Sequence, residues 1–460
     1  MVATTEPLAV THVTLIDGTG AAPIADATVL LRDGRVAAAG PAAAVPVPEG
    51  CREIEGRGRW LIPGLADAHV HVQLSSGEPA LRHWLAWGVT TVRDLGGDPD
   101  VVLPLRDRER AGALVGARVL AYGPFLDGDP PIFGNRRQPG LGDLGNSVRV
   151  LTTPESVDET VDACLAMGVD GFKLYAGLRS DLLARVVQRV GSRVPVNAHL
   201  GRTWASEAAE AGVNCLEHVH ASIYQDVARP EDRHTRDGGN GAMPNYWTWL
   251  SEGWSRADLD APYVQRFIEL LVEKGVYLSA TTDLLGPGGL AGSPHQGEDP
   301  DRVYAPRAQV ERWQEQAQMM EQARQSGAAP PTPAPPDPAL GQAALEKQLA
   351  FLGMFHRAGG KLLAGTDTGV IRLIPGVALH NELAFLTRAG VDPLTVIHIA
   401  TQRAAEAMRR AEEQGSLTPG KRGDAVLLTA DPLTEISNTR SIELVIKDGV
   451  VYRPDELWVR

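Results

Sequence analysis

The feature that most constrains the fold is a repeated alternation of strand-like and helix-like segments through the middle of the chain. Alanine-rich or amphipathic stretches, such as residues 154–167 and 205–211, separate short apolar runs that are typical of buried strands. This alternation predicts a parallel sheet covered by helices, because parallel strands need long crossover connections. We expect strands at residues 63–72, 89–94, 118–122, 171–176, 194–200, 215–220, 276–282 and 361–368. Eight such units predict an α/β fold, a (β/α)8 TIM barrel with insertions.

Both ends of the chain show a different pattern of short strands and turns. Asp33-Gly34 near the N-terminus and Asp448-Gly449 near the C-terminus each lie between apolar runs. An Asp-Gly pair in this setting is a strong hairpin signal. We therefore expect a small β-sandwich domain built from both chain termini, residues 1–62 and 411–460, beside a barrel domain of residues 63–410.

Two long insertions interrupt the predicted barrel, near residues 221–262 and 285–345. The second contains a Pro/Ala run at residues 328–338, which predicts a loop. Both follow predicted strands six and seven, so they would overhang the barrel end where active sites lie. The first contains three tryptophans that could line a substrate, anchor a lid or form an oligomer contact, namely Trp247, Trp249 and Trp254.

Composition and charge exclude several classes of partner. The 460-residue chain is 43% hydrophobic and 22% charged, which is typical of a globular protein. Its formal net charge of −13 argues against a nucleic-acid partner. We see no secretory signal and no apolar stretch that reaches about 18 residues, so we expect no membrane partner. The three cysteines lie far apart in the sequence, which favours a reducing, cytoplasmic location.

A histidine pair closes the first predicted strand, in Pro63-Gly-Leu-Ala-Asp-Ala-His69-Val-His71. Residues two apart in a strand point to the same side, so both imidazoles would project together at the mouth of the barrel. Two neutral imidazoles side by side suit Zn²⁺ or a similar divalent ion. Because a bare His-x-His is also common by chance, further ligands are needed to identify a site.

Four more candidate ligands lie at or near the ends of other predicted strands. Lys173 lies in an apolar strand, where an ammonium is costly unless it is paired or modified. His199, His218 and Asp367 lie at the ends of predicted strands five, six and eight. Histidines and a carboxylate from several strands would therefore meet at one end of the barrel, which predicts a metal centre.

These motifs resemble the amidohydrolase superfamily, especially its imidazolonepropionase-like and prolidase-like members. The segments that carry the resemblance are Leu61-Ile-Pro-Gly-Leu-Ala-Asp-Ala-His-Val-His71, Phe172-Lys-Leu-Tyr175, Asn197-Ala-His199, Glu217-His218 and Ala364-Gly-Thr-Asp-Thr368. The terminal segments 33–40 and 415–426 also resemble that superfamily. The resemblance covers nearly the whole chain apart from the two insertions.

The resemblance implies a catalytic barrel domain with two divalent metal ions, for which zinc is favoured over Mn²⁺, Fe²⁺ or Co²⁺. The six implied ligands are His69, His71, Lys173, His199, His218 and Asp367. The first two histidines and Asp367 would hold the more buried ion, and the other two histidines would hold the second. Lys173, carbamylated by carbon dioxide or bicarbonate, would bridge them; otherwise it could extend to solvent or pair with a carboxylate. A shared hydroxide would be the nucleophile, and Asp367 would be the catalytic group that handles its proton.

Four further residues are candidates for substrate binding, each with an alternative role. His220 shares a side of its strand with His218 and could replace it or bind substrate. Tyr175 could donate a hydrogen bond to substrate or belong to the core. His380 opens a helix after the eighth strand and could contact substrate or solvent. Arg93 could face the pocket or form an ion pair.

The implied activity is hydrolysis of an amide, peptide or cyclic-amide bond in a small molecule, with dipeptides and N-acyl amino acids preferred by analogy. Ester, lactone or carbamate hydrolysis on the same centre is the close alternative. A metal-dependent lyase or decarboxylase and a non-catalytic interaction protein are further alternatives, and the second of these predicts a missing ligand. A homo-oligomer is compatible with a barrel enzyme, although no residue identifies one.

Overall fold

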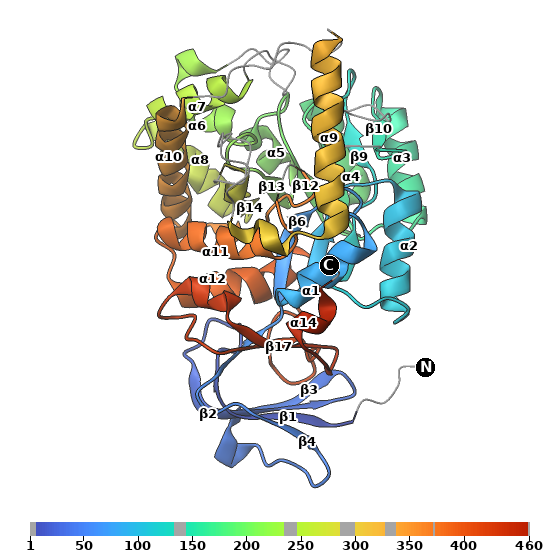
Figure 1. Cartoon of the computed structure of the whole chain (residues 1–460). Coiled ribbons are helices and arrows are strands. Elements are labelled where there is room, and N and C mark those ends of the chain that lie inside the picture. Colours follow the sequence, from blue (N-terminus) through green and yellow to red (C-terminus); the bar gives the residue numbers. More distant parts are fainter. Residues whose placement is uncertain are drawn as a thin grey trace.

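Parallel strands occupy the centre of the molecule, as the alternating sequence pattern predicts (Figure 1). The computed structural model describes residues 6–132, 144–233, 246–285, 300–326, 337–370 and 373–458. Within these ranges, one sheet has the order β6-β7-β8 and a second has the order β10-β9-β11-β12-β13-β14-β15. The strands are β6 (Leu65–Val70), β7 (Val89–Asp94), β8 (Arg118–Ala121), β9 (Phe125–Asp127), β10 (Val148–Val150), β11 (Phe172–Leu174), β12 (Val196–Ala198), β13 (Cys215–Glu217), β14 (Tyr277–Ser279) and β15 (Lys361–Leu363).

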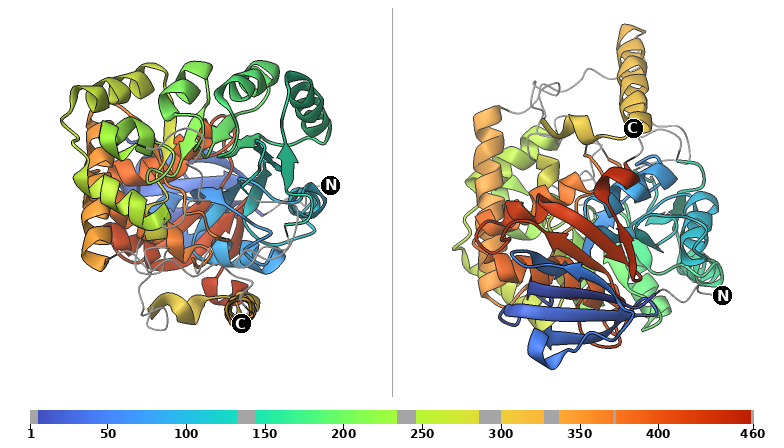
Figure 2. Two further views of the ribbon diagram at one scale, coloured as in Figure 1. Left: turned by 90° about the horizontal axis from the view of Figure 1, so that it is seen from above. Right: turned by 60° about the horizontal axis from the view of Figure 1, so that its bottom comes forward.

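Backbone hydrogen bonds connect the two sheets at both edges. The Ala68 amide donates to the Ala364 carbonyl over 2.9 Å, and the Asp170 amide donates to the Ala121 carbonyl over 2.8 Å. Helices lie around the outside of the strands (Figure 2). They include α1 (Glu78–Ala86), α2 (Pro99–Arg110), α3 (Pro154–Ala166), α4 (Ser180–Val190), α5 (Ala205–Ala211), α8 (Pro262–Glu273), α11 (Val377–Arg388), α12 (Pro393–His398) and α13 (Ala404–Ala407). This arrangement is a TIM-barrel-like α/β fold.

Each of the eight predicted strand positions contains a strand, and both helices named from the sequence, at residues 154–167 and 205–211, are present as α3 and α5. The helices form because their apolar residues repeat at helical spacing. In α4, for example, Leu182, Val186 and Val190 recur every four residues and are all buried. The sequence pattern does not predict β9 and β10, because segments of three residues are too short to show a period.

Strands from both ends of the chain share one further sheet, which lies at the bottom of Figure 1. Its order is β18-β17-β16-β5-β1-β2-β3, and β4 also pairs with β1. Both predicted hairpins are present. Asp33 and Gly34 have φ of 51° and 72°, and Asp448 and Gly449 have φ of 50° and 78°, so each pair supplies the two positive φ angles of a type I′ turn. The strands are β1 (Leu8–Leu15), β2 (Ile24–Arg32), β3 (Arg35–Pro41), β4 (Arg52–Glu55), β5 (Trp60–Pro63), β16 (Ala425–Leu428), β17 (Ile442–Lys447) and β18 (Val450–Tyr452), followed by α14 (Pro454–Leu457).

The two insertions are largely helical where they are described. They contain α6 (Tyr224–Val227), α7 (Tyr246–Arg256), α9 (Arg307–Gln325) and the first part of α10 (Pro338–Arg357). In α10, Leu345, Leu349 and Leu352 are buried at helical spacing, so packing on the barrel explains this helix. Most of the Pro/Ala run lies outside the described residues. No helix in the described ranges is long and apolar enough to cross a membrane.

A buried arginine joins the terminal sheet to the parallel strands. Arg118 begins β8, and its Nη1 donates to Asp424 Oδ2 over 2.7 Å. Its Nη2 donates to both carboxylate oxygens of Asp448, over 2.9 and 2.8 Å. Asp424 precedes β16 and is itself buried. One guanidinium therefore neutralises two carboxylates that belong to the C-terminal part of the chain.

We expect Arg118→Met to lower the free energy of unfolding by about 3 kcal/mol, because it leaves Asp424 buried without a counter-ion. Urea denaturation followed by circular dichroism measures this change. Arg179→Met, which removes an exposed ion pair with Asp181, is the matched control and should change stability little. An Arg118→Met protein as stable as the wild type would contradict this role for the arginine.

Candidate metal centre

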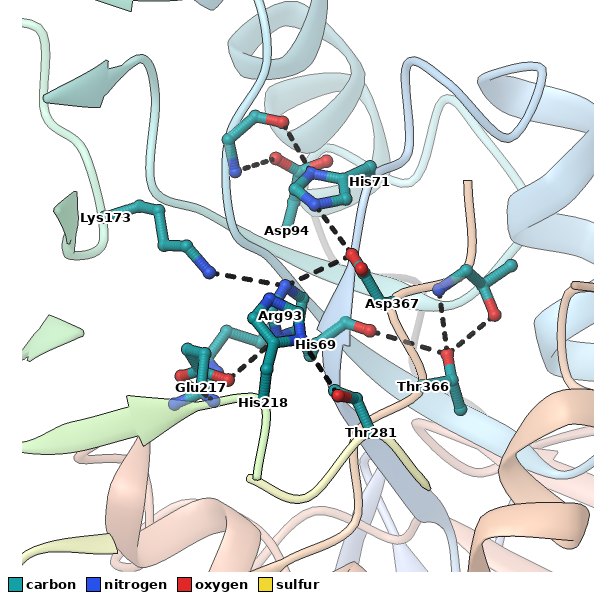
Figure 3. Close-up of polar contacts among 12 residues, drawn as sticks. His69, His71, Arg93, Asp94, Lys173, Glu217, His218, Thr281, Thr366 and Asp367 are labelled. Atoms are coloured by element: carbon teal, nitrogen blue, oxygen red, sulfur yellow. Dashed lines mark hydrogen bonds and ion pairs between the residues drawn. The ribbon is translucent and has the colours of Figure 1, made fainter. Parts of the chain in front are cut away.

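Side chains from the ends of several parallel strands meet at one point (Figure 3). Ligand atoms of His69, His218 and Asp367 lie within 4.8 Å of one another, and all three side chains are buried. His69 lies in β6, His218 directly follows β13, and Asp367 lies shortly after β15. The parallel order of these strands explains the meeting, because it places their carboxyl ends at the same edge.

His69 is held between a carboxylate on one side and the cluster on the other. Its Nδ1 lies 2.8 Å from Glu217 Oε2, and because a carboxylate only accepts, Nδ1 carries the proton. Nε2 then presents its lone pair to the cluster, 3.3 Å from Asp367 Oδ1 and 3.4 Å from Lys173 Nζ. Such an outer carboxylate that fixes the tautomer is typical of a metal-binding histidine.

His71 and His218 are oriented in the same way. His71 Nδ1 donates to the Gly96 carbonyl over 2.9 Å, and its Nε2 lies 3.0 Å from Asp367 Oδ1. His218 Nδ1 lies 2.9 Å from Thr281 Oγ1, which leaves Nε2 for the cluster. Three histidines therefore have an outer partner on Nδ1 and an inner nitrogen available as a ligand.

His199 adds a fourth ring to this group. Its centroid lies 4.4 Å from that of His218, and the His218 centroid lies 4.6 Å from that of His69. The two histidines expected to hold a second ion are thus neighbours.

The surroundings keep most of these histidines neutral. Burial, followed by the positive charge of Lys173, lowers the pKa of His69 and of His199 well below the ordinary value. Burial and the neighbouring histidines do the same to the pKa of His218. For His71 burial also lowers the pKa, but Asp367 outweighs it and the pKa is raised. A neutral imidazole is the form that binds a metal ion.

Lys173 lies in β11 with its side chain fully buried. Burial lowers its pKa to about 8, against the opposing charges of Glu217 and Asp367. Within the described part of the chain, Lys173 forms no ion pair with a carboxylate, and its Nζ instead contacts His69. The position therefore favours an uncharged or modified amine over an ordinary ammonium.

Two residues of the cluster have strained backbones. His218 has φ of 69° and Asp367 has φ of 65°, in the left-handed region that non-glycine residues rarely adopt. Such a conformation costs on the order of 1–3 kcal/mol per residue and persists only where the surroundings enforce it. Strain at two clustered donors is typical of a functional site.

The donor set fits divalent metal ions. It combines neutral imidazole nitrogens with one carboxylate, and a buried amine lies beside them. Imidazole and carboxylate ligands suit Zn²⁺ and related ions, and no thiolate takes part because Cys215 lies outside the cluster. The described residues therefore form a candidate metal centre.

Sequence reasoning missed the residues that contact the outer nitrogens of the histidine ligands. Glu217 is fully buried and accepts from His69 Nδ1, Arg93 Nη2 and Asn197 Nδ2, over 2.8, 2.9 and 2.7 Å. Thr281 holds His218. A carboxylate inside the apolar strand of residues 215–220 was a signal that could have identified Glu217, because a buried charge needs partners.

The four predicted substrate-binding residues separate into two pairs. Tyr175 and His220 lie beside the centre, with ring centroids 4.8 Å from His199 and 5.4 Å from His218. Arg93 lies beneath the centre, fully buried in its ion pair with Glu217, so the ion-pair alternative describes it.

His380 lies away from the centre, and its ring is enclosed by protein. Its Nδ1 lies 2.8 Å from Thr439 Oγ1, and its Nε2 lies 3.0 Å from the Trp87 carbonyl. With 1% exposure His380 does not face solvent, which corrects that alternative, and substrate binding by His380 stays a prediction.

The strand arrangement and the cluster define a TIM-barrel-like protein with a candidate metal site. A family model described as the amidohydrolase family matches residues 60–452. The match covers most of the chain, and the protein therefore belongs to the amidohydrolase family. This membership confirms the resemblance to amidohydrolases that the sequence motifs predict.

Individual relatives match with low identity or over short segments. An adenine deaminase of Desulforamulus reducens is 22% identical over 204 residues, which cover 44% of this chain and 33% of the relative. An imidazolonepropionase of Caulobacter vibrioides is 47% identical over 49 residues, 11% of this chain and 12% of the relative. These matches span a third or less of the relatives' own lengths.

A solved structure matches over nearly the full length. A prolidase-like protein of Bifidobacterium longum has a TM-score of 0.69 at 23% identity, and the match covers 99% of this chain and 98% of that one. At this identity the likeness shows the fold. Imidazolonepropionases and prolidase-like proteins are thus among the relatives, as the sequence resemblance predicts.

We expect Glu217→Gln to weaken binding of Zn²⁺ about 10- to 100-fold, because the neutral amide no longer fixes the proton on His69 Nδ1. Competition with a chromophoric chelator measures the affinity. Glu210→Gln, which alters a surface ion pair with Lys274, is the control and should bind Zn²⁺ like the wild type. Unchanged affinity in a folded Glu217→Gln protein would show that Glu217 has a purely structural role.

Proposed function

We propose that this protein hydrolyses an amide, peptide or cyclic-amide bond of a small molecule at a centre of two divalent metal ions. The observation that carries the proposal is the set of histidines whose outer nitrogens are engaged and whose inner nitrogens meet beside Asp367. The ligands are those implied by the sequence, His69, His71, Lys173, His199, His218 and Asp367.

Lys173 would join the two halves of this centre as a carbamate. Its Nζ lies between the ring of His69 and the charges of Glu217 and Asp367, in a fully buried position. An uncharged amine reacts with carbon dioxide, and the resulting anionic oxygens are better metal ligands than an ammonium. Carbamylation would also remove the cost of burying a positive charge.

Asp367 would move the proton. Its Oδ1 lies between His69 and His71, close to where the ligand atoms meet. When bound, divalent ions lower the pKa of a coordinated water and polarise a carbonyl. Asp367 would accept the proton from the attacking water and deliver it to the departing nitrogen, while the outer partners hold the histidines still.

Small peptides and N-acyl amino acids are the preferred substrates, by analogy with the prolidase-like structural relative. Esters, lactones and carbamates are the close alternative, because the same centre would attack any polarised acyl carbon. The relatives named as deaminases also cleave carbon–nitrogen bonds, which supports an amide-type substrate.

Several finer features belong to the same proposal. We infer that the two parallel sheets close into one (β/α)8 barrel over residues 63–410, because hydrogen bonds link them at both edges. The terminal strands of residues 1–62 and 411–460 would form the sandwich domain. Zinc, a cytoplasmic location and a homo-oligomeric state stay predictions.

Elemental analysis of protein purified with bicarbonate and without chelator tests the centre. We expect about two metal equivalents per chain in the wild type and one or fewer in Lys173→Ala, because the bridging ligand is lost. Lys274→Ala removes an exposed lysine and should keep both ions. One equivalent in both wild type and Lys173→Ala would indicate a mononuclear centre, and no metal in either after reconstitution would refute the proposal.

Oxygen-18 water distinguishes hydrolysis from lyase or decarboxylase chemistry. With dipeptides and N-acyl amino acids as substrates, we expect mass spectrometry to find the label in the new carboxylate, because the attacking oxygen comes from water. Asp367→Asn should lower kcat by about 100-fold or more. Turnover that leaves the product unlabelled would exclude hydrolysis.

A further inference from the structure

Aromatic rings form a continuous series around one side of the metal centre. Consecutive ring centroids lie 4.4–5.6 Å apart along the whole series. Starting from His71, the series continues through Phe125, Tyr175, His199, His218, His220 and Trp247. Phe125, Tyr175 and Trp247 are not histidines and are not expected metal ligands. They supply aromatic surface beside the ligands.

The Trp247 end of the series is fixed by α7, which belongs to the first insertion. Trp254 of α7 is buried, and its Nε1 donates to the His220 carbonyl over 2.8 Å. Its ring also packs against Phe351 of α10, with centroids 6.3 Å apart. Figure 1 shows α7 beside α10. This anchor holds Trp247, about two turns earlier on α7, against the ring of His220.

The near end is fixed by close packing against a glycine. Phe125 is 5% exposed, and a Cβ added to Gly96 would lie 2.3 Å from its ring. The Gly96 carbonyl also holds His71, so the same glycine positions both a ligand and the aromatic ring beside it. Tyr175 continues from Phe125, and burial raises its pKa well above the ordinary value.

One member of the series has an unused polar atom. His220 is 3% exposed, and its Nδ1 has no hydrogen-bond partner within the described ranges. A buried nitrogen without a partner is unusual in a folded protein and can be satisfied by a ligand. The ring of His220 lies next to the rings of His218 and Trp247.

We propose that this series is a specificity pocket for a planar aromatic group attached to the scissile bond, with Trp247 and Phe125 as its walls. The inference rests on the proposed hydrolase function and specifies its substrate class as aryl or arylalkyl amides, such as N-aroyl amino acids or dipeptides with an aromatic residue. Aromatic rings gain energy from offset or edge contacts with other rings beyond that of apolar burial, so the walls would favour a flat ring over a saturated one.

Matched hydroxamates test the pocket without requiring turnover. Benzohydroxamate and cyclohexanecarbohydroxamate share a metal-binding group and differ in the planarity of the ring. On the metal-reconstituted full chain, calorimetry should show benzohydroxamate binding about tenfold more tightly. Trp247→Ala should reduce this ratio to about one, Trp247→Phe should retain most of it, and Trp249→Ala, whose ring packs on Tyr224 instead, should leave it unchanged.

Hydrolysis of N-benzoyl and N-acetyl amino acids, measured on the same samples, tests the proposed hydrolase function separately from the aromatic pocket. Equal binding of the two hydroxamates by the wild type, or a preference that survives in a folded Trp247→Ala protein, would overturn the pocket even if hydrolysis occurs. Selective binding without hydrolysis of any substrate would support the pocket and refute the proposed function. Failure of both hydroxamates to bind would overturn both.

Discussion

The buried carboxylate of Glu217 is the constraint on which the rest of the site depends. It accepts hydrogen bonds from His69, Arg93 and Asn197, which come from β6, β7 and β12, and Glu217 itself ends β13. Four strands therefore share one charge that is out of contact with water. Because a buried ion is costly unless all its partners are in place, any change in the relative position of these strands would be opposed.

The protein positions its reactive groups by two different means. On the strand side, the Nδ1 atoms of His69, His71 and His218 each have their own partner. The backbones of His218 and Asp367 are strained there. On the insertion side, a buried tryptophan fixes α7, so a helix that lies outside the repeating fold can present a ring to the centre. The first arrangement uses the repeating strands, and the second uses a helix outside them.

Much of the fold and the inner part of the site could be predicted from the sequence. His69 and His71 were predictable because a strand of period two projects them together, and the Asp-Gly hairpins because their φ preferences are local. The burial of His380 could not be predicted, because it depends on Thr439 and Trp87, which are remote in sequence. Glu217 was missed for the same reason, since its partners come from three other strands. Helices α7 and α10 were not predicted, since the only element assigned within the insertions was a loop at the Pro/Ala run of residues 328–338.

The sharing of one sheet between the two ends of the chain has a consequence for the order of folding. The N-terminal hairpin of β2 and β3 pairs locally with β1, but β5 finds its antiparallel partner β16 only after the whole parallel-strand domain has been synthesised. Until then one edge of the growing sheet has unpaired backbone groups, which are prone to pair with other chains. A ribosome-bound nascent chain would thus carry an open edge for most of its synthesis, and its protection by a chaperone would matter more than for a protein whose sheets form from neighbouring segments.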